Sequence, residues 1–145
     1  MHPVRQICIG TGLVLLDQIS KYYVRNFTDL KIIENRSLPF GIDLGSGFLN
    51  LTVIVIALAS FVWLFPLTRP ATTLSRSGRG IGGEGLGFIL IVGGATANII
   101  DRIHHGRVVD FINIGISTLN LADLAIMGGI ALLLMSNAKA QMSKS

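Results

Sequence analysis

Two aspartates in the C-terminal third of the chain are the residues best suited to chemistry. Asp110 and Asp123 lie in residues 98–123, NIIDRIHHGRVVDFINIGISTLNLAD, which hold three of the chain's eight acidic residues. Two carboxylates at close quarters cannot both ionise readily, so such a pair holds one proton over a useful pH range. The ionised member can take a proton from water while the other hydrogen-bonds a carbonyl oxygen, as in aspartic proteases. The pair predicts hydrolysis without a metal or cofactor.

The chain between the two aspartates decides whether they can meet. In one continuous helix they would be about 20 Å apart, at 1.5 Å per residue, which is too far for cooperation. The segment GRVVDFINIGIS is too short and too polar to cross a membrane, and its Val, Phe and Ile content favours an extended segment. A break at Gly115 can fold Asp110 back against the first turns of a helix that holds Asp123.

A metal site and a nucleophilic site compete for the same stretch. His104 and His105 lie between the acids, but adjacent histidines cannot readily chelate one metal, and the chain has no HExxH motif or cysteine pair. Ser117 lacks a G-x-S-x-G setting, and Cys8 lies in an apolar helix. Neither alternative matches the residues as well as the aspartate pair does.

The elements that position these residues are predicted to be membrane helices. The chain is 50% hydrophobic and 14% charged, too apolar for an ordinary soluble domain of 145 residues. A helix that crosses the bilayer needs about 20 apolar residues. We expect one all-α integral membrane domain over residues 1–145, with a small β-like loop element and four spans, at about 4–24, 48–68, 85–102 and 118–136.

The loops then alternate between the two sides of the membrane. Residues 69–83 carry three arginines and no acid before Glu84, which suits a cytoplasmic loop, and loops 25–47 and 103–117 would lie outside. The basic residues divide six against six between the two sides, so the charge rule alone gives a tie. Basic charge here indicates membrane surfaces rather than nucleic acid, since aromatic residues do not alternate with it.

Ionisable residues within the predicted spans need a reason, because each costs at least about 2.5 kcal/mol at the membrane centre. Asp17 and Lys21 are four apart on one helical face, the spacing of a structural ion pair. Gly87, Gly94, Asn98 and Asp101 share another face, where small residues permit close packing. Asp101 and Arg102 either point into the bundle or anchor the helix at the interface. Asn120 and Asp123 share a face of the last helix.

Four pieces of the chain, in this order, resemble the lipoprotein signal peptidase family, also called signal peptidase II. They are DQISK (17–21), GGATANIIDR (93–102), GRVVDF (106–111) and LNLAD (119–123). The resemblance implies a four-span aspartic endopeptidase of the bacterial inner membrane that acts at the extracytoplasmic face. Its substrate would be a diacylglyceryl-modified prolipoprotein, cut just before the lipidated cysteine, and membrane lipid would be the other partner of a monomeric enzyme.

The same resemblance assigns roles to the matching residues. It implies that Asp110 and Asp123 are catalytic, and that a second set orients them and binds substrate: Asn35, Asn98, Arg102 and Asn120. Asp17, Lys21 and Asp101 would support the structure. The segment ENRSLPFG matches less well, because Ser37 and Pro39 replace a glycine and an alanine of the family, and Ala97 replaces a common glycine. These departures affect the loop that carries Asn35 rather than the aspartates.

Two other classes of protein remain as alternatives. A small proton-coupled carrier or channel subunit would also place acids in the membrane, although usually near mid-bilayer and with internal repeats, which are not visible here. A purely structural bundle would make Asp110 an exposed loop carboxylate that can be replaced without consequence.

Overall fold

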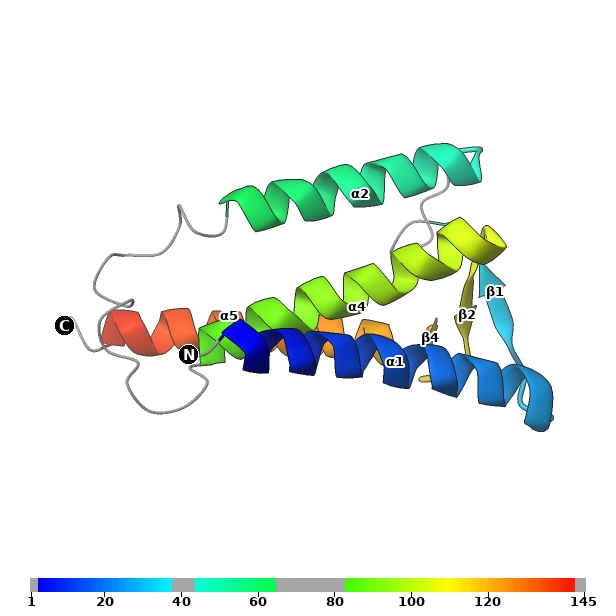
Figure 1. The fold of residues 1–145 in the computed structure, drawn as a ribbon, viewed down its shortest axis with the longest axis horizontal. Coiled ribbons are helices and arrows are strands. Elements are labelled where there is room, and N and C mark those ends of the chain that lie inside the picture. Colours follow the sequence, from blue (N-terminus) through cyan, green and yellow to red (C-terminus); the bar gives the residue numbers. More distant parts are fainter. Residues whose placement is uncertain (1–2, 38–43, 65–82, 143–145) are drawn as a thin grey trace.

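The fold is a group of long helices with short strands gathered at one end (Figure 1). The computed structural model describes residues 3–37, 44–64 and 83–142. Within them the helices are α1 (Pro3–Phe27), α2 (Gly47–Leu64), α4 (Gly83–His105) and α5 (Leu121–Met142). Helix α4 packs against all three others, most extensively against α5, and so forms the centre of the bundle.

Three of these helices are long and apolar enough to cross a membrane: Gly47–Leu64, Glu84–His105 and Leu121–Lys139. Helix α1 is also long enough, but it carries Arg5, Asp17, Lys21 and Arg25. The helix bounds lie close to the predicted spans. Helix α5 begins at Leu121 rather than 118 because Thr118 and Leu119 form a strand. The predicted basic loop 69–83, apart from Gly83, and the end of the second predicted span lie outside the described residues.

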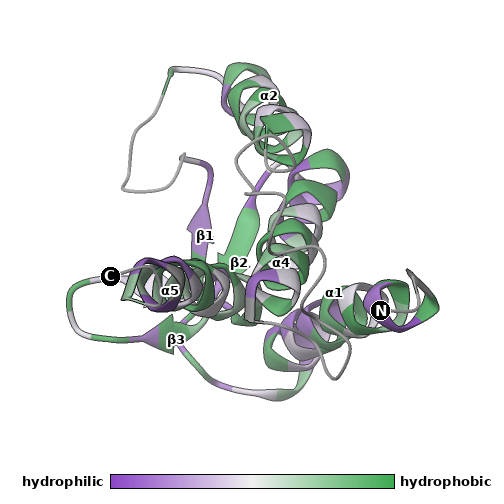
Figure 2. Ribbon diagram, turned by 90° about the vertical axis from the view of Figure 1, so that its left-hand side faces the viewer, coloured by the Kyte–Doolittle hydropathy of each residue, from purple (hydrophilic) through white to green (hydrophobic). Residues whose placement is uncertain are grey.

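Burial in the bundle is inverted relative to a water-soluble protein. The buried side chains include Asp17, Lys21, Asn98, Asp101 and Asn120, whereas many large apolar side chains along the helices are exposed, Trp63 at 74% among them. Figure 2 shows that α2 is largely hydrophobic and β1 hydrophilic. Such a surface suits a hydrocarbon solvent, in which the polar residues of a bundle face one another.

Helices α4 and α5 touch through glycines. A Cβ atom built on Gly94 would lie 2.5 Å from the carbonyl oxygen of Ala122, and one on Gly87 would lie 2.7 Å from that of Gly129. The reverse contact, from a Cβ on Gly129 to the carbonyl oxygen of Gly87, would be 2.6 Å. Small residues therefore set the separation of the two helices, and with it the place of Asn98 relative to Asp123.

Replacing Gly129 by alanine tests this contact. We expect Gly129→Ala to lower the melting temperature in detergent, because an overpacked interface costs about 1–3 kcal/mol. The neighbouring Gly128 has nothing within 4 Å of its built Cβ, so Gly128→Ala should leave stability unchanged or raise it. Equal melting temperatures for the two variants would contradict close packing at Gly129.

The strands bring the chain after α1 beside the chain after α4. Strand β1 (Ile33–Asn35) pairs antiparallel with β2 (Val108–Asp110), with Ile33 opposite Asp110. Strands β3 (Ile112–Asn113) and β4 (Thr118–Leu119) form a hairpin, whose turn contains Gly115 at φ 89°. Residues 108–113 are thus extended, as predicted, and the turn at Gly115 returns the chain to the start of α5.

Candidate active site

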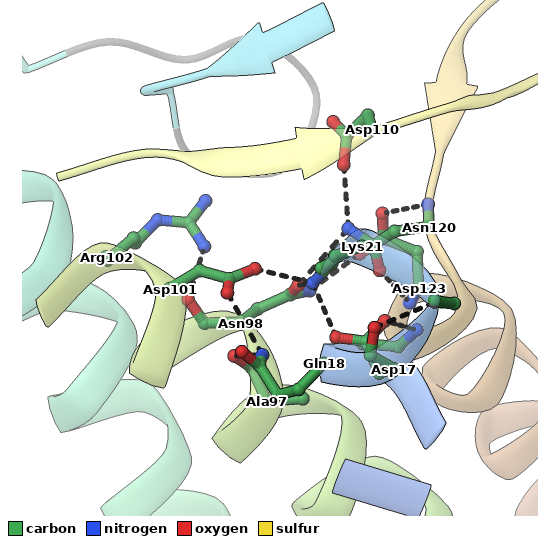
Figure 3. Close-up of polar contacts among 12 residues, drawn as sticks. Asp17, Gln18, Lys21, Ala97, Asn98, Asp101, Arg102, Asp110, Asn120 and Asp123 are labelled. Carbon is green, nitrogen blue, oxygen red and sulfur yellow. Dashed lines mark hydrogen bonds and ion pairs between the residues drawn. The ribbon is translucent and has the colours of Figure 1, made fainter. Parts of the chain in front are cut away.

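Asp110 ends β2 and faces the start of α5. Its side chain is buried, with the residue 2% exposed, so it is not the exposed loop carboxylate that a structural bundle would require. Its Oδ1 accepts a hydrogen bond from Asn120 Nδ2 at 2.7 Å, and its Oδ2 accepts one from Asn35 Nδ2 at 3.3 Å. Donors from two other segments, β1 and the residue before α5, therefore converge on this carboxylate, and Figure 3 shows the contact with Asn120.

Asp123 lies in the first turn of α5, where it forms a reciprocal cap with Asn120. Asn120 Oδ1 accepts the backbone N–H of Asp123 at 2.9 Å, and Asp123 Oδ2 accepts the backbone N–H of Asn120 at 3.2 Å. This is a capping box with aspartate in the place of the usual glutamate. The cap fixes both side chains, and Asn120 joins the two aspartates because it also donates to Asp110.

The orientation of each amide in the site follows from its partners. Asn98 Oδ1 lies 3.2 Å from Lys21 Nζ, which can only donate, so Asn98 Nδ2 must point to Asp123, whose Oδ1 it meets at 2.8 Å. Asn120 is fixed in the same way, since its Oδ1 accepts a backbone N–H. Both oxygens of Asp123 therefore accept hydrogen bonds, which hold the carboxylate in one orientation.

A buried charge cluster lies beneath this network. Lys21 Nζ is 2.6 Å from Asp17 Oδ2 and 2.6 Å from Asp101 Oδ2. Asp17 Oδ1 accepts the backbone N–H of Ala122, which ties α1 to the first turn of α5. Gln18 Nε2 donates to Asp101 and to the carbonyl of Ala97. The cluster joins α1, α4 and α5, and Asp101 points into the bundle rather than anchoring an interface.

Arg102 connects α4 to the segment after β1. Its Nη2 donates to the carbonyl oxygen of Ser37 at 2.9 Å, and its Nη1 donates to that of Asn98 at 3.3 Å. Its Nε is buried and has no hydrogen-bond partner among the described residues. The guanidinium of Arg102 thus holds the carbonyl groups of Asn98 and Ser37, and its Nε–H can donate to a further acceptor.

The surroundings of Asp110 change its acidity. Burial raises the pKa of this carboxyl to about 6, and the nearby negative charge of Asp123 acts in the same direction. Hydrogen bonds from Asn120 and Asn35 and the charge of Lys21 oppose the increase. Asp110 therefore holds its proton to a higher pH than an ordinary aspartate does.

This raised pKa predicts how stability depends on pH. Between pH 4 and about 7 the folded protein binds a proton at Asp110 that the unfolded chain has lost, so stability should fall as pH rises through that window. We expect the melting temperature of the Asp110→Asn variant to fall less than that of the wild type. Parallel melting curves for the two proteins across this range would exclude a raised pKa at Asp110.

An open groove of about 640 Å³ lies beside Asp110, lined among others by Asn35, Ser37, Ile116 and Ser117. Ser117 therefore lies near the site, although on an exposed turn, and His104 and His105 lie on the exposed last turn of α4. Cys8 is exposed on α1. Among the described residues, no three His, Cys, Asp or Glu side chains are placed to hold a metal. Gln18 is the member of the network that sequence reasoning missed, although it lies inside the quoted DQISK.

The fold and site define a class: a mostly helical membrane protein with an asparagine-linked aspartate pair, of which Asp110 is buried, at one end of the bundle. Two solved bacterial membrane enzymes, studied by the in meso method at 2.3 and 1.9 Å, share the fold. The first has a TM-score of 0.77 and 21% identity, and the match covers all of this chain and 94% of that one. The second has a TM-score of 0.71 at the same identity, covering 94% of each chain.

Sequence comparison gives the family. The family model described as signal peptidase (SPase) II matches residues 9–139, and the chain belongs to that family. A lipoprotein signal peptidase of Moorella thermoacetica is 33% identical, the match covering 83% of this chain and 84% of the relative. One of Coxiella burnetii (strain Dugway 5J108-111) is 36% identical, covering 84% and 82%. Membership supports a peptidase over a carrier or a structural bundle.

Proposed function

We propose that this protein removes the signal peptide from diacylglyceryl-modified prolipoproteins, cutting just before the lipidated cysteine. The observation that carries the proposal is the meeting of Asp110 and Asp123 around Asn120, from a strand and a helix that are separate in the sequence. Family membership and the names of the relatives support the substrate class.

The proposed mechanism gives the two aspartates different roles. Asp123, whose oxygens both accept hydrogen bonds, is the ionised base that takes a proton from water. Asp110, with its raised pKa, is the protonated partner that hydrogen-bonds the scissile carbonyl oxygen. The hydroxide adds to the carbonyl carbon, and collapse of the tetrahedral intermediate breaks the C–N bond. The base then returns its proton to the leaving amine, and no cofactor enters these steps.

Substrate binding is proposed to use the polar groups around the pair. Asn35 and Arg102, held beside Asp110 and Ser37, would bind the extended substrate backbone, and the buried Nε of Arg102 offers a donor for a substrate carbonyl. Asn98 and Asn120 would orient the aspartates. Lys21, Asp17 and Asp101 would hold the three helices together beneath them.

We further propose that α1 is a fourth span, because its charged residues Asp17 and Lys21 are buried against α4 and α5 rather than facing lipid. The strand-bearing end would face outward from the bacterial inner membrane, where a signal helix and a lipidated cysteine meet at the interface. Residues 69–83 would lie in the cytoplasm, and the enzyme would act as a monomer, with substrate entering sideways from the membrane.

Cleavage by the purified protein tests the proposed function. A diacylglyceryl-modified prolipoprotein, mixed with the protein in detergent, should shift on a gel to a product whose mass places the cut before the modified cysteine. The same precursor without its lipid is the matched control and should stay uncut. Equal cutting of both precursors, or of neither, would be incompatible with this substrate class.

A further inference from the structure

Asn50 is an unusual residue on α2. Every residue of this helix is described, and Asn50 is the only buried one, at 1% exposure, whereas Phe48 next to the helix start is 77% exposed. An amide buried on an otherwise apolar helix costs free energy unless it is hydrogen-bonded. Its partners therefore indicate why a polar side chain lies at this position.

Both groups of the amide bind backbone that lies outside α2. Asn50 Nδ2 donates to the carbonyl oxygen of Arg36 at 3.0 Å, and Asn50 Oδ1 accepts the N–H of Leu44 at 3.0 Å. The side chain thus joins two points of the connection between β1 and α2. Because one contact needs a donor and the other an acceptor, an amide meets both requirements at once.

The residues on each side of Arg36 reach the candidate site. Asn35 donates to Asp110 Oδ2, and the carbonyl oxygen of Ser37 accepts from Arg102 Nη2. The β1–β2 ladder ends at Asn35, so the strand pairing does not hold Arg36 or Ser37. Three consecutive residues are therefore fixed by β2, α2 and α4 in turn, and Asn50 supplies the middle contact.

We propose that Asn50 is a positioning residue, which holds Asn35 and Ser37 at the distance from Asp110 that substrate binding requires. This inference rests on the proposed function. The contact between Asn35 and Asp110 is already long, at 3.3 Å, so a small shift of Arg36 breaks it. Asn50 thereby affects the affinity for the substrate backbone without touching substrate.

Asn50→Leu removes the hydrogen bonds to Arg36 and Leu44 while keeping a side chain of similar size. We expect KM for the lipidated precursor to rise about tenfold and kcat to stay within about twofold, the loss that two hydrogen bonds to a binding segment imply. Thr52→Val is the matched control, because Thr52 Oγ1 donates to the carbonyl oxygen of Phe48 within the same helix, and it should keep wild-type kinetics. Unchanged KM in folded Asn50→Leu protein would overturn the inference.

A mutant cycle separates positioning from general loss of stability. In an Asn35→Ala background, Asn50→Leu should reduce kcat/KM by clearly less than the roughly tenfold expected in the wild type, because one of the two residues that Asn50 positions has lost its side chain. If kcat/KM of the double variant falls by the product of the two single effects, the substitutions act independently and the positioning role is refuted.

If Asn50→Leu does not fold, amide hydrogen exchange on the wild type is the deciding measurement. Slow exchange at the Leu44 N–H supports the contact with Asn50, and exchange at the rate of an unfolded chain refutes it. An inactive wild type would instead reject the proposed function.

Discussion

Asp110→Asn and Asp123→Asn are each expected to reduce cleavage of the lipidated precursor by at least about 10⁴-fold while the protein stays folded. Asparagine has the shape of aspartate, and its amide oxygen can still accept the hydrogen bond that Asn120 donates, from its Nδ2 to position 110 and from its backbone N–H to position 123. The variant at Asp123 cannot take a proton from water, and the one at Asp110 cannot give one to a developing oxyanion.

Gel-shift rates and thermal unfolding, recorded on the same samples, check this result. Asp29→Asn is the matched control, since Asp29 is an exposed carboxylate just after α1 and should leave both measurements unchanged. A folded variant at Asp110 or Asp123 that cuts near the wild-type rate would refute the assignment. Asp101, the remaining carboxylate of the quoted stretch, would then be the next residue to test.

The largest effect on stability is expected from Lys21→Met. Lys21 lies between Asp17 and Asp101, at 2.6 Å from an oxygen of each, and the residue is 4% exposed. Its removal leaves two buried carboxylates without a counter-ion, which costs about 3–5 kcal/mol. We expect a large fall in melting temperature in detergent and loss of activity, because α1 no longer holds Asn98 and the first turn of α5.

Neutralising the two carboxylates that Lys21→Met leaves unpaired should restore much of the lost stability. Lys21→Met combined with Asp17→Asn and Asp101→Asn keeps acceptors for Ala122 and Gln18, so its melting temperature should recover toward the wild type. The exposed Lys31 offers a control, Lys31→Met, which should melt as the wild type does. A Lys21→Met protein as stable as that control would show that the buried cluster contributes little.

The sequence predicted the parts of the site better than their connections. Hydrophobic length predicted the apolar helices, and the turn at Gly115 explained how Asp110 approaches the start of α5. The contact between Lys21 and Asn98 joins residues 77 positions apart, and no periodicity within one helix can predict it. Spacing showed that Asn120 and Asp123 share a face, but not that they cap the helix together.

The roles of Asn50 and Gly129 depend on contacts with other segments, which the sequence pattern around each residue does not predict. Asn50 is one polar residue in an apolar stretch, and its role depends on where the chain before α2 lies. Gly128 and Gly129 are adjacent and chemically identical, yet one faces open space and the other touches Gly87. The rotation of α5 about its axis decides this difference, and packing against α4 sets that rotation.

The hydrogen bond from Ala122 to Asp17 has a consequence for biosynthesis. It joins the first helix to a residue 105 positions later in the chain, and Asp101, which binds Lys21, follows that lysine by 80 positions. During translation, the Asp17–Lys21 ion pair of α1 therefore emerges before Asp101 and Ala122, the partners that the later helices supply. A ribosome-bound chain that stops before α5 lacks Asp123 and the cap at Asn120, so the first helix should be retained near the insertion machinery until the last one arrives. The aspartate pair can therefore assemble only after the start of α5 has been made.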